Sequence, residues 1–430
     1  MGEVFLEPTK TRLAGRMDRM EKDWNIVVVG AGVFGLTTAL ELALQGYRNV
    51  TILDRHVPPV RRERSFPTAL ESADSWIQQV PDGSSVDISR VIRFDYADDV
   101  YLKVAYEAYQ KWAQSPKYRD IFVPAPVVLT SNHNPVGRSY IQKATEALDR
   151  AHLPWATLES ADDTQRLYPA ISGSLTGPGF MGYHNQQAGW ADAQKAIAGL
   201  RDECVVRGVS FVSGRAGTVV GFDHTTLGTI RAARTLAGAE VFADLFILAA
   251  GAWAASLVPM YNSTLSTGQV LAYLRLSPEE MVKYQQLPIY VNFGTGWFNF
   301  PPHLDTSLLK IAVHGWGYER SPSEVERKIL KSDVSTPPLA VSNSRKNYIP
   351  SDGERRLRDG LKELLPELGD RLFERVAVCW YTDTPTGDFI MDYHPEYRNL
   401  FIAGGGSGQY VFPSTACSCT AMYAGQLWIC

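Results

Sequence analysis

The fold of this chain is decided by one short stretch near its N-terminus, Asn25-Ile-Val-Val-Val-Gly30-Ala-Gly32-Val-Phe-Gly35. Its β-branched run is typical of a parallel strand that is buried on both faces. Leucine and alanine recur at helical spacing over residues 36–45, and a second apolar run over residues 49–53 ends at Asp54. The stretch therefore opens a strand, helix and strand unit of about thirty residues.

The glycines of the same stretch match the pattern G-x-G-x-x-G. In this pattern Gly30 permits a tight turn, Gly32 lets the backbone approach a pyrophosphate, and Gly35 lets the helix pack closely on the strand. Asp54 stands where an acidic side chain accepts hydrogen bonds from a ribose. The alternative is a glycine turn without a ligand. The context favours a Rossmann-like dinucleotide-binding domain, although the pattern alone does not distinguish NAD from FAD.

Composition narrows the class of protein further. A chain of 430 residues is long enough for two joined domains with separate cores. Its net charge of -4 offers no basic field to a nucleic acid. The five cysteines are odd in number and irregularly spaced, which argues against a disulfide framework and against a zinc site. We expect no nucleic-acid partner and no metal.

The two ends of the chain carry no clear targeting signal. Residues 1–24 hold five basic and five acidic side chains without an apolar core, which predicts a loose tail. The longest uncharged apolar run begins at Leu245 and is interrupted at Pro259, short of the ~20 residues that a membrane span needs. We expect a cytoplasmic monomer without membrane contact. A peroxisomal location stays open if the native C-terminus lies beyond Cys430.

A second apolar segment favours FAD over NAD. The stretch Leu245-Phe-Ile-Leu-Ala-Ala-Gly251-Ala-Trp253 predicts a buried strand, a glycine turn and a short helix. It resembles the second flavin-binding strand and turn of FAD-dependent amine oxidases. The alternative is an ordinary core strand that stops at a glycine.

A C-terminal motif carries a more specific resemblance. Arg375-Val-Ala-Val-Cys379-Trp-Tyr-Thr-Asp383-Thr-Pro is similar to a motif of the monomeric sarcosine oxidase and fructosyl amino acid oxidase (amadoriase) family. The likeness continues through Gly387-Asp388-Phe-Ile-Met-Asp392-Tyr-His-Pro395 and Asn399-Leu-Phe-Ile-Ala-Gly404-Gly-Gly-Ser-Gly408. The family joins the motif cysteine to the 8α-methyl of the flavin, so the resemblance implies covalent FAD on Cys379. Otherwise, an isolated buried cysteine is usually a small hydrophobe.

A pair of arginines resembles the substrate motif of the same family. The stretch is Ser89-Arg90-Val-Ile-Arg93-Phe-Asp-Tyr96. The resemblance implies that Arg90 lies near the flavin and that Arg93 grips the substrate carboxylate, for which a guanidinium offers two parallel donors. The alternative for Arg93 is an ion pair with Asp95 or Asp98.

A lysine in an apolar strand resembles the group with which the family promotes the oxygen reaction. Ser307-Leu-Leu-Lys310-Ile-Ala312 matches the strand whose lysine lies over the flavin N5. A fixed cation there would stabilise the negative charge that develops on oxygen. The alternative is a lysine that snorkels to solvent. Tyr381, beside the motif cysteine, is expected to line the pocket.

The resemblance extends from about residue 25 to residue 408 and then stops. The family continues Gly-Ser-Gly-His-Gly-Phe-Lys-Phe, followed by a closing helix, whereas this chain reads Gly406-Ser-Gly408-Gln409-Tyr-Val-Phe-Pro413. The lysine that provides the family's second carboxylate contact has no counterpart. A catalytically impaired flavoprotein is therefore one alternative.

These observations predict an α/β fold with an α+β substrate lobe, in which a Rossmann-like FAD-binding domain joins a mainly antiparallel-sheet substrate domain. We expect an FAD-dependent oxidase of secondary amines that produces hydrogen peroxide, with fructosyl amino acids as leading substrates and saccharopine, pipecolate or N-methyl amino acids as alternatives. The predicted domains are a tail over 1–24, the FAD-binding domain over 25–115, 185–262 and 375–430, and the substrate domain over 116–184 and 263–374. The predicted catalytic residues are Lys310, Arg93 and Tyr381. The predicted cofactor contacts are Gly30, Ala31, Gly32, Val33, Phe34, Gly35, Asp54, Arg55, Arg90, Gly251, Trp253, Cys379, Gly406, Ser407 and Gly408.

Overall fold

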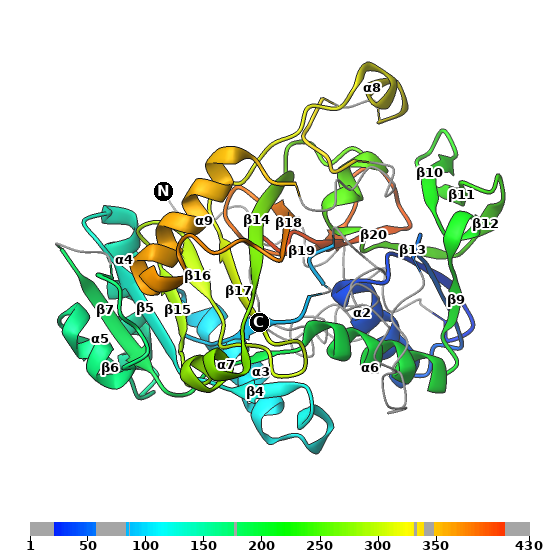
Figure 1. The fold of residues 1–430 in the computed structure, drawn as a ribbon. Helices are drawn as coiled ribbons and strands as arrows, with labels where there is room; N and C mark the ends of the chain where they lie inside the picture. The colour runs from blue at the N-terminus through cyan, green and yellow to red at the C-terminus, as the bar shows by residue number, and fades with distance from the viewer. Residues whose placement is uncertain are drawn as a thin grey trace, which may run out of the picture.

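The computed structural model of the chain describes residues 21–56, 83–85, 87–175, 179–330, 333–338 and 348–408. Most of the predicted N-terminal tail lies outside these residues, and so does the segment after Gly408 with its three cysteines. Figure 1 shows two neighbouring bodies, one around the blue strands and one around the yellow-green strands.

The first body is built on a sheet that we call the dinucleotide sheet. Its strands run in the order β19 (Ile390–Tyr393), β20 (Leu400–Gly404), β13 (Leu245–Leu248), β1 (Asn25–Val29), β2 (Asn49–Leu53) and β9 (Ser210–Val212). The central strand β1 pairs in parallel with both β13 and β2.

Both faces of this sheet are covered. Ile26 and Val28 pack in one cluster with residues of α2 (Val33–Leu44) and α6 (Ala193–Val206). Val27 and Val29 pack in another cluster with residues of a small sheet made of β10 (Val219–His224), β11 (Ile230–Thr235) and β12 (Glu240–Phe242). The prediction of a strand buried on both faces is confirmed.

The turn after β1 requires glycine for a steric reason. Gly30 has φ +112°, and a Cβ there would lie 2.4 Å from the carbonyl oxygen of Ala249. A Cβ on Gly35 would lie 1.9 Å from the oxygen of Gly30. Neither position can accept a side chain while strand, turn and helix keep their places.

The second body is built on what we call the large sheet. Its strands run in the order β18 (Arg375–Asp383), β14 (Leu265–Arg275), β17 (Leu308–Val313), β16 (Trp297–Asn299), β15 (Ile289–Asn292), β5 (Val127–Ser131), β7 (Met181–Asn185) and β6 (Ala156–Leu158). Neighbouring strands are antiparallel except for β15 and β5, which are parallel. The predicted mainly antiparallel sheet is confirmed, and the apolar region 289–300 forms a hairpin of two strands.

A smaller sheet contributes the segment that carries the two arginines. It consists of β3 (Arg90–Ile92), β8 (Gly189–Ala191) and β4 (Phe122–Pro124). The remaining helices are α3 (Asp99–Gln114), η2 (Pro116–Tyr118), α4 (Pro135–Arg150), α5 (Ala161–Leu167), η3 (Gly214–Ala216), η4 (Gly251–Ser256), α7 (Pro278–Tyr284), α8 (Glu324–Leu330), α9 (Ser351–Leu364) and η6 (Pro366–Leu368). None of the helices within the described ranges is long and apolar enough to cross a membrane.

Strand pairing bears on one predicted domain boundary. The predicted FAD-binding domain includes residues from 375 onward, and β18 within that range pairs along its whole length with β14 of the large sheet. A residue can face a cofactor from a neighbouring lobe, so the cysteine motif did not show to which sheet its strand belongs. The domain boundaries stay predictions.

Candidate active site

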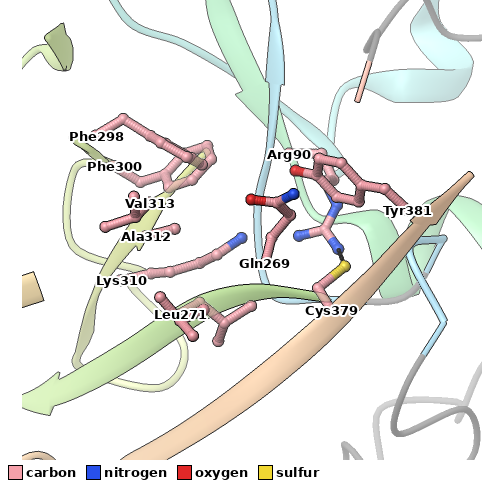
Figure 2. Close-up of a pocket in the computed structure, with 11 residues that line it drawn as sticks. Arg90, Gln269, Leu271, Phe298, Phe300, Lys310, Ala312, Val313, Cys379 and Tyr381 are labelled. Carbon is pink, nitrogen blue, oxygen red and sulfur yellow. Dashed lines mark hydrogen bonds between the residues drawn. The ribbon is translucent and has the colours of Figure 1, made fainter. Parts of the chain in front are cut away.

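A pocket opens on one face of the large sheet, where three adjacent strands present alternate residues. In an antiparallel sheet, residues two apart on one strand share a face with their partners on the next strand. Gln269 pairs with Cys379, and Leu271 pairs with Ala312. The pocket is lined by Arg90, Gln269, Val270, Leu271, Phe298, Phe300, Lys310, Ala312, Val313, Cys379 and Tyr381 (Figure 2).

Lys310 is buried in this pocket and makes polar contacts there. Its side chain is 2% exposed, and Nζ lies 2.7 Å from Oδ2 of Asp87. Nζ also donates to the carbonyl oxygen of Ser89 at 2.8 Å and lies 4.6 Å from the centre of the Phe300 ring. Burial lowers the pKa of Lys310 to about 8, against the opposing effect of the Asp87 carboxylate. The alternative of a lysine that snorkels to solvent is therefore wrong.

Asp87 is a buried carboxylate that the sequence analysis missed. It forms an ion pair with Arg90 as well as with Lys310. Its Oδ1 accepts hydrogen bonds from the Tyr273 hydroxyl at 2.6 Å and from the backbone N–H of Ile88 at 2.7 Å. Burial alone would raise the pKa of the Asp87 carboxyl, but Lys310 and Arg90 outweigh burial and hold that pKa well below its usual range. The only sequence signal was an acid three residues before Arg90.

Arg90 joins this group to the motif cysteine. Its guanidinium is buried, and Nη2 lies 3.7 Å from Sγ of Cys379, within hydrogen-bond distance for sulfur. Figure 2 shows this contact, with the Lys310 ammonium pointing into the same space from β17, which is separated from the strand of Cys379 by β14. The structure therefore brings together three of the residues singled out from the sequence.

Arg93 is held by a network outside the pocket lining. Nη1 lies 3.1 Å from Oδ1 of Asp95 and donates to the Asp95 carbonyl oxygen at 2.7 Å, while Nη2 donates to the Tyr140 hydroxyl at 3.0 Å. The ion pair that we considered as an alternative thus forms with Asp95. Asp98 instead caps α3, accepting hydrogen bonds from the first backbone N–H groups of that helix. Whether Arg93 also binds a substrate carboxylate stays a prediction.

Two aromatic side chains and a glycine lie against one another at the pocket, and Tyr381 among them lines it, as its position beside the motif cysteine predicts. The rings of His314 and Tyr381 have centroids 5.6 Å apart, and a Cβ on Gly408 would lie within 2.7 Å of both side chains. Burial, aided by the charge of Arg93, lowers the pKa of His314 to about 4. The imidazole is therefore neutral near pH 7. Sequence analysis missed His314, although it follows Lys310 by four residues in the chain.

The glycine turn is anchored by two polar side chains. Asp54 accepts hydrogen bonds from the backbone N–H groups of Ala31 at 2.6 Å and His56 at 2.7 Å. At the start of α2, the N–H of Val33 donates to Oγ of Ser85 at 3.0 Å. Ser85 therefore lies over the helix N-terminus where a phosphate is expected, and the sequence analysis did not identify it.

The other predicted cofactor contacts lie around the turn. A Cβ on Gly406 would lie 3.5 Å from the Phe34 ring. Arg55 lies over the Trp253 ring, 4.0 Å from its centre. Gly251 has φ +53°, and Ser407 accepts a hydrogen bond from the N–H of Thr384.

The site contains an unsatisfied polar group that suits a polar ligand. Oγ of Ser89 is buried and has no hydrogen-bond partner among the described residues, while the carbonyl of the same residue holds Lys310. Buried hydroxyls in native proteins are nearly always paired. The glycine turn and the start of α2 offer the close backbone approach and the helix N-terminus that suit the pyrophosphate of a dinucleotide.

One further group of side chains has metal-ligand chemistry within the described ranges. Asp192, His303 and Asp305 could place ligand atoms within 4.8 Å of one another. However, the ammonium of Lys195 lies 3.3 Å from Asp192 and 2.6 Å from Asp305. A lysine cation already neutralises these carboxylates, so we assign no metal to them.

Comparison with known proteins identifies the family. The profile of the FAD dependent oxidoreductase family matches residues 25–419, so the chain belongs to that family. The L-saccharopine oxidase of Schizosaccharomyces pombe is 28% identical over 394 residues, which cover 89% of this chain and 85% of the relative. Amino acid oxidase imqH of Aspergillus flavus is 28% identical over 448 residues, covering 89% of this chain and 88% of the relative.

Solved structures show the same relationship. Amadoriase I of Aspergillus fumigatus, a fructosyl amine:oxygen oxidoreductase, aligns with a TM-score of 0.75 and 28% identity over 94% of this chain and 86% of its own. The predicted fold class and the predicted family resemblance are confirmed. The cofactor of the family is FAD.

Proposed function

We propose that the protein oxidises secondary amines whose α-carbon carries a carboxylate, with fructosyl amino acids as the leading substrate class. The observation that carries the proposal is the convergence of a buried ammonium, Lys310, with Cys379 and Arg90 in one pocket. The relatives named above support it, because saccharopine and fructosyl amines are both secondary amines.

The residues that would hold FAD come from both sheets. The backbone around Gly30 and Gly32 would bind the pyrophosphate. Asp54 can still accept hydrogen bonds from a ribose, because each carboxylate oxygen can accept more than one hydrogen bond. Cys379 would supply the covalent link to the flavin. When bound, FAD accepts a hydride from the substrate and passes the electrons to oxygen, which gives hydrogen peroxide.

Arg93 would bind the substrate carboxylate. A guanidinium has five N–H donors, and the contacts with Asp95 and Tyr140 leave part of this capacity for a ligand. Asp95 partly neutralises Arg93, so the attraction for a carboxylate would be moderate. The same two partners restrict the orientation of the guanidinium before a substrate arrives.

The walls of the pocket would keep the substrate amine in its neutral form. Phe298, Phe300 and Ala312 offer an apolar surface, and an apolar environment disfavours an ammonium. His314 is neutral near pH 7 and so adds no positive charge beside the substrate amine, but its low pKa makes it too weak a base to hold the amine proton. A neutral amine is the form from which a hydride leaves readily.

Lys310 would act in the reaction with oxygen. Its ammonium is fixed by Asp87 and by the carbonyl of Ser89 and is shielded from water. A preorganised cation in such a site stabilises developing negative charge far more than it would in water.

The proposed covalent link is tested by Cys379→Ala. The variant should bind FAD without acid-stable attachment, because the glycine turn and Asp54 act independently of the cysteine. Acid precipitation followed by an absorption spectrum of pellet and supernatant measures the attached fraction. Flavin that stays in the pellet of the variant would identify another residue as the link.

The proposed substrate class is tested by hydrogen peroxide release. Fructosyl valine, fructosyl lysine, saccharopine, pipecolate and sarcosine should be compared at equal flavin content. We expect the highest kcat/KM on a fructosyl amino acid. A higher value on saccharopine would transfer the assignment to that substrate, and no turnover on any of them would support the alternative of a flavoprotein without this activity.

A further inference from the structure

A single carboxylate connects the two cations of the pocket. Oδ2 of Asp87 contacts both the Lys310 ammonium and the Arg90 guanidinium. All three side chains are buried, with exposed fractions of 3% for Asp87, 2% for Lys310 and 6% for Arg90. Without Asp87, two positive charges would lie close together out of contact with water, which is costly.

The carboxylate is itself held on its other side. Oδ1 accepts from the hydroxyl of Tyr273 and from the N–H of Ile88. Tyr273 is directly paired with Lys310 across β14 and β17. Asp87 therefore connects the segment before β3 with the large sheet, because its carboxylate contacts the N–H of Ile88 on one side and the side chains of Tyr273 and Lys310 on the other.

We propose that Asp87 is a positioning residue of the oxidase site, which holds the Lys310 ammonium at the pocket and keeps it protonated. This inference rests on the proposed function, in which Lys310 acts on oxygen. The charges around Lys310 support it. The positive charge of Arg90 disfavours the protonated form of Lys310, and the nearby Asp87 carboxylate opposes that effect.

The charge environment of Lys310 comes from several elements packed against it. The titratable or charged groups that face it or its counter-ion are Asp87, Arg90, Tyr273, Arg375 and Cys379. Burial lowers the pKa of Lys310 to about 8 with Asp87 in place. Because a nearby carboxylate favours the charged form of a lysine, its removal must lower that pKa further.

The test is Asp87→Asn, read as the pH dependence of the oxygen reaction. The flavin-loaded protein is reduced chemically with dithionite, mixed with oxygenated buffer, and followed by absorbance from about pH 4 to pH 10, which spans the transitions expected in both proteins. In the native protein, the rate should fall as the pH rises through about 8. In the variant, this fall should move about one to three pH units lower, the shift expected for loss of one adjacent opposite charge. At pH 8 the variant should therefore react more slowly by about fivefold for a shift of one unit and by several hundredfold for a shift of three units.

A double-mutant cycle separates positioning from a general structural effect. In a Lys310→Met background, Asp87→Asn should change the oxygen reaction less than twofold, because the group through which Asp87 acts is gone. Equal effects of Asp87→Asn with and without Lys310, or an unmoved pH profile, would overturn the proposal. Chemical reduction needs no amine substrate, so a wrong substrate assignment does not affect this result.

Asp95→Asn is the matched control, since it removes a buried carboxylate from the other arginine of the same segment. It should alter substrate binding through Arg93 and leave the pH profile of the oxygen reaction where it is in the native protein. A shift of that profile by Asp95→Asn equal to that of Asp87→Asn would show that any buried charge has this effect, which contradicts a specific role for Asp87.

If Asp87→Asn does not fold, the pair is tested from the lysine side. Asp87 has a lowered pKa when folded, so its ionisation stabilises the protein above the unfolded pKa of about 3.9 and this stability is lost as the pH falls further. Lys310→Met should weaken this loss, so its urea unfolding midpoint should depend less on pH between pH 5 and 3 than that of the native chain. Identical acid dependence would show that the two groups are not coupled and would overturn the proposal.

Discussion

The glycine turn after β1 and the pocket on the large sheet are built in opposite ways. In the turn, contiguous residues bring their backbone close to the expected ligand, and Gly30 and Gly35 contribute by having no side chain. In the pocket, Lys310, Cys379 and Arg90 come from three segments and contribute their side chains. Function at the turn therefore depends on local steric fit, whereas function at the pocket depends on distant charges that must be brought together.

Gly30→Ala should have the largest effect on the free energy of unfolding, because its methyl group would overlap with the backbone of Ala249 at the turn. Its matched control is Gly46→Ala, since Gly46 has φ +88° but a methyl group there would meet no atom within 4 Å. A left-handed backbone costs a non-glycine residue about 1–3 kcal/mol at both sites. Overpacking against Ala249 should add about 1–3 kcal/mol at Gly30 alone. Urea unfolding of both variants measures the difference, and equal losses would show that overlap at the turn is relieved by movement.

Lys310→Met should have the next largest effect, because it removes the fixed charge from the pocket. We expect the oxygen reaction to slow by roughly 10²–10³, the range observed when one preorganised stabilising group is removed. Reduction by substrate should change much less. Stopped-flow measurement of each half-reaction tests this split. Lys195→Met, which removes a partly exposed lysine paired with Asp192 and Asp305, should leave both halves near the native rates.

Arg93→Met should act on substrate binding. A charge-assisted hydrogen bond contributes about 1.5–3 kcal/mol, so loss of one contact should raise the dissociation constant of a carboxylate inhibitor roughly ten- to a hundredfold. Titration of the flavin spectrum with the inhibitor measures the constant. Tyr140→Phe keeps the charge of Arg93 and removes one of its partners, so its effect should be several times smaller. An unchanged constant in Arg93→Met would assign the carboxylate to another group.

Ser85→Ala, a substitution beside the glycine turn, should have the smallest effect. Its hydroxyl accepts one hydrogen bond from the first turn of α2, and loss of such a cap costs about 1 kcal/mol. FAD binding should weaken by roughly fivefold at that cost. A loss above a hundredfold would show that the turn depends on side chains as strongly as the pocket does, and the contrast between the two regions would fail.

Several features of the site could be read from the chain because they are local. The strand, glycine turn and helix around Gly30 follow from side-chain volume and periodicity over about twenty residues. The resemblance of the motifs around Cys379, Lys310 and Arg90 named three residues that the structure places in one pocket. The same motifs did not show that β18 pairs with β14 of the large sheet, because strand pairing is a long-range property that a motif does not encode.

The sequence by itself determined the class of the dinucleotide turn, the mainly antiparallel character of the large sheet and the family, since these depend on residue type and spacing along the chain. Tertiary structure decided which charges meet. Asp87 lies more than two hundred residues from Lys310 in the chain, yet its carboxylate is 2.7 Å from the ammonium. Asp95, rather than Asp98, pairs with Arg93, although both are near it in sequence. Electrostatic interactions depend on distance and burial in space, and for Asp87 and Lys310 neither quantity is set until the segment before β3 has packed against the large sheet.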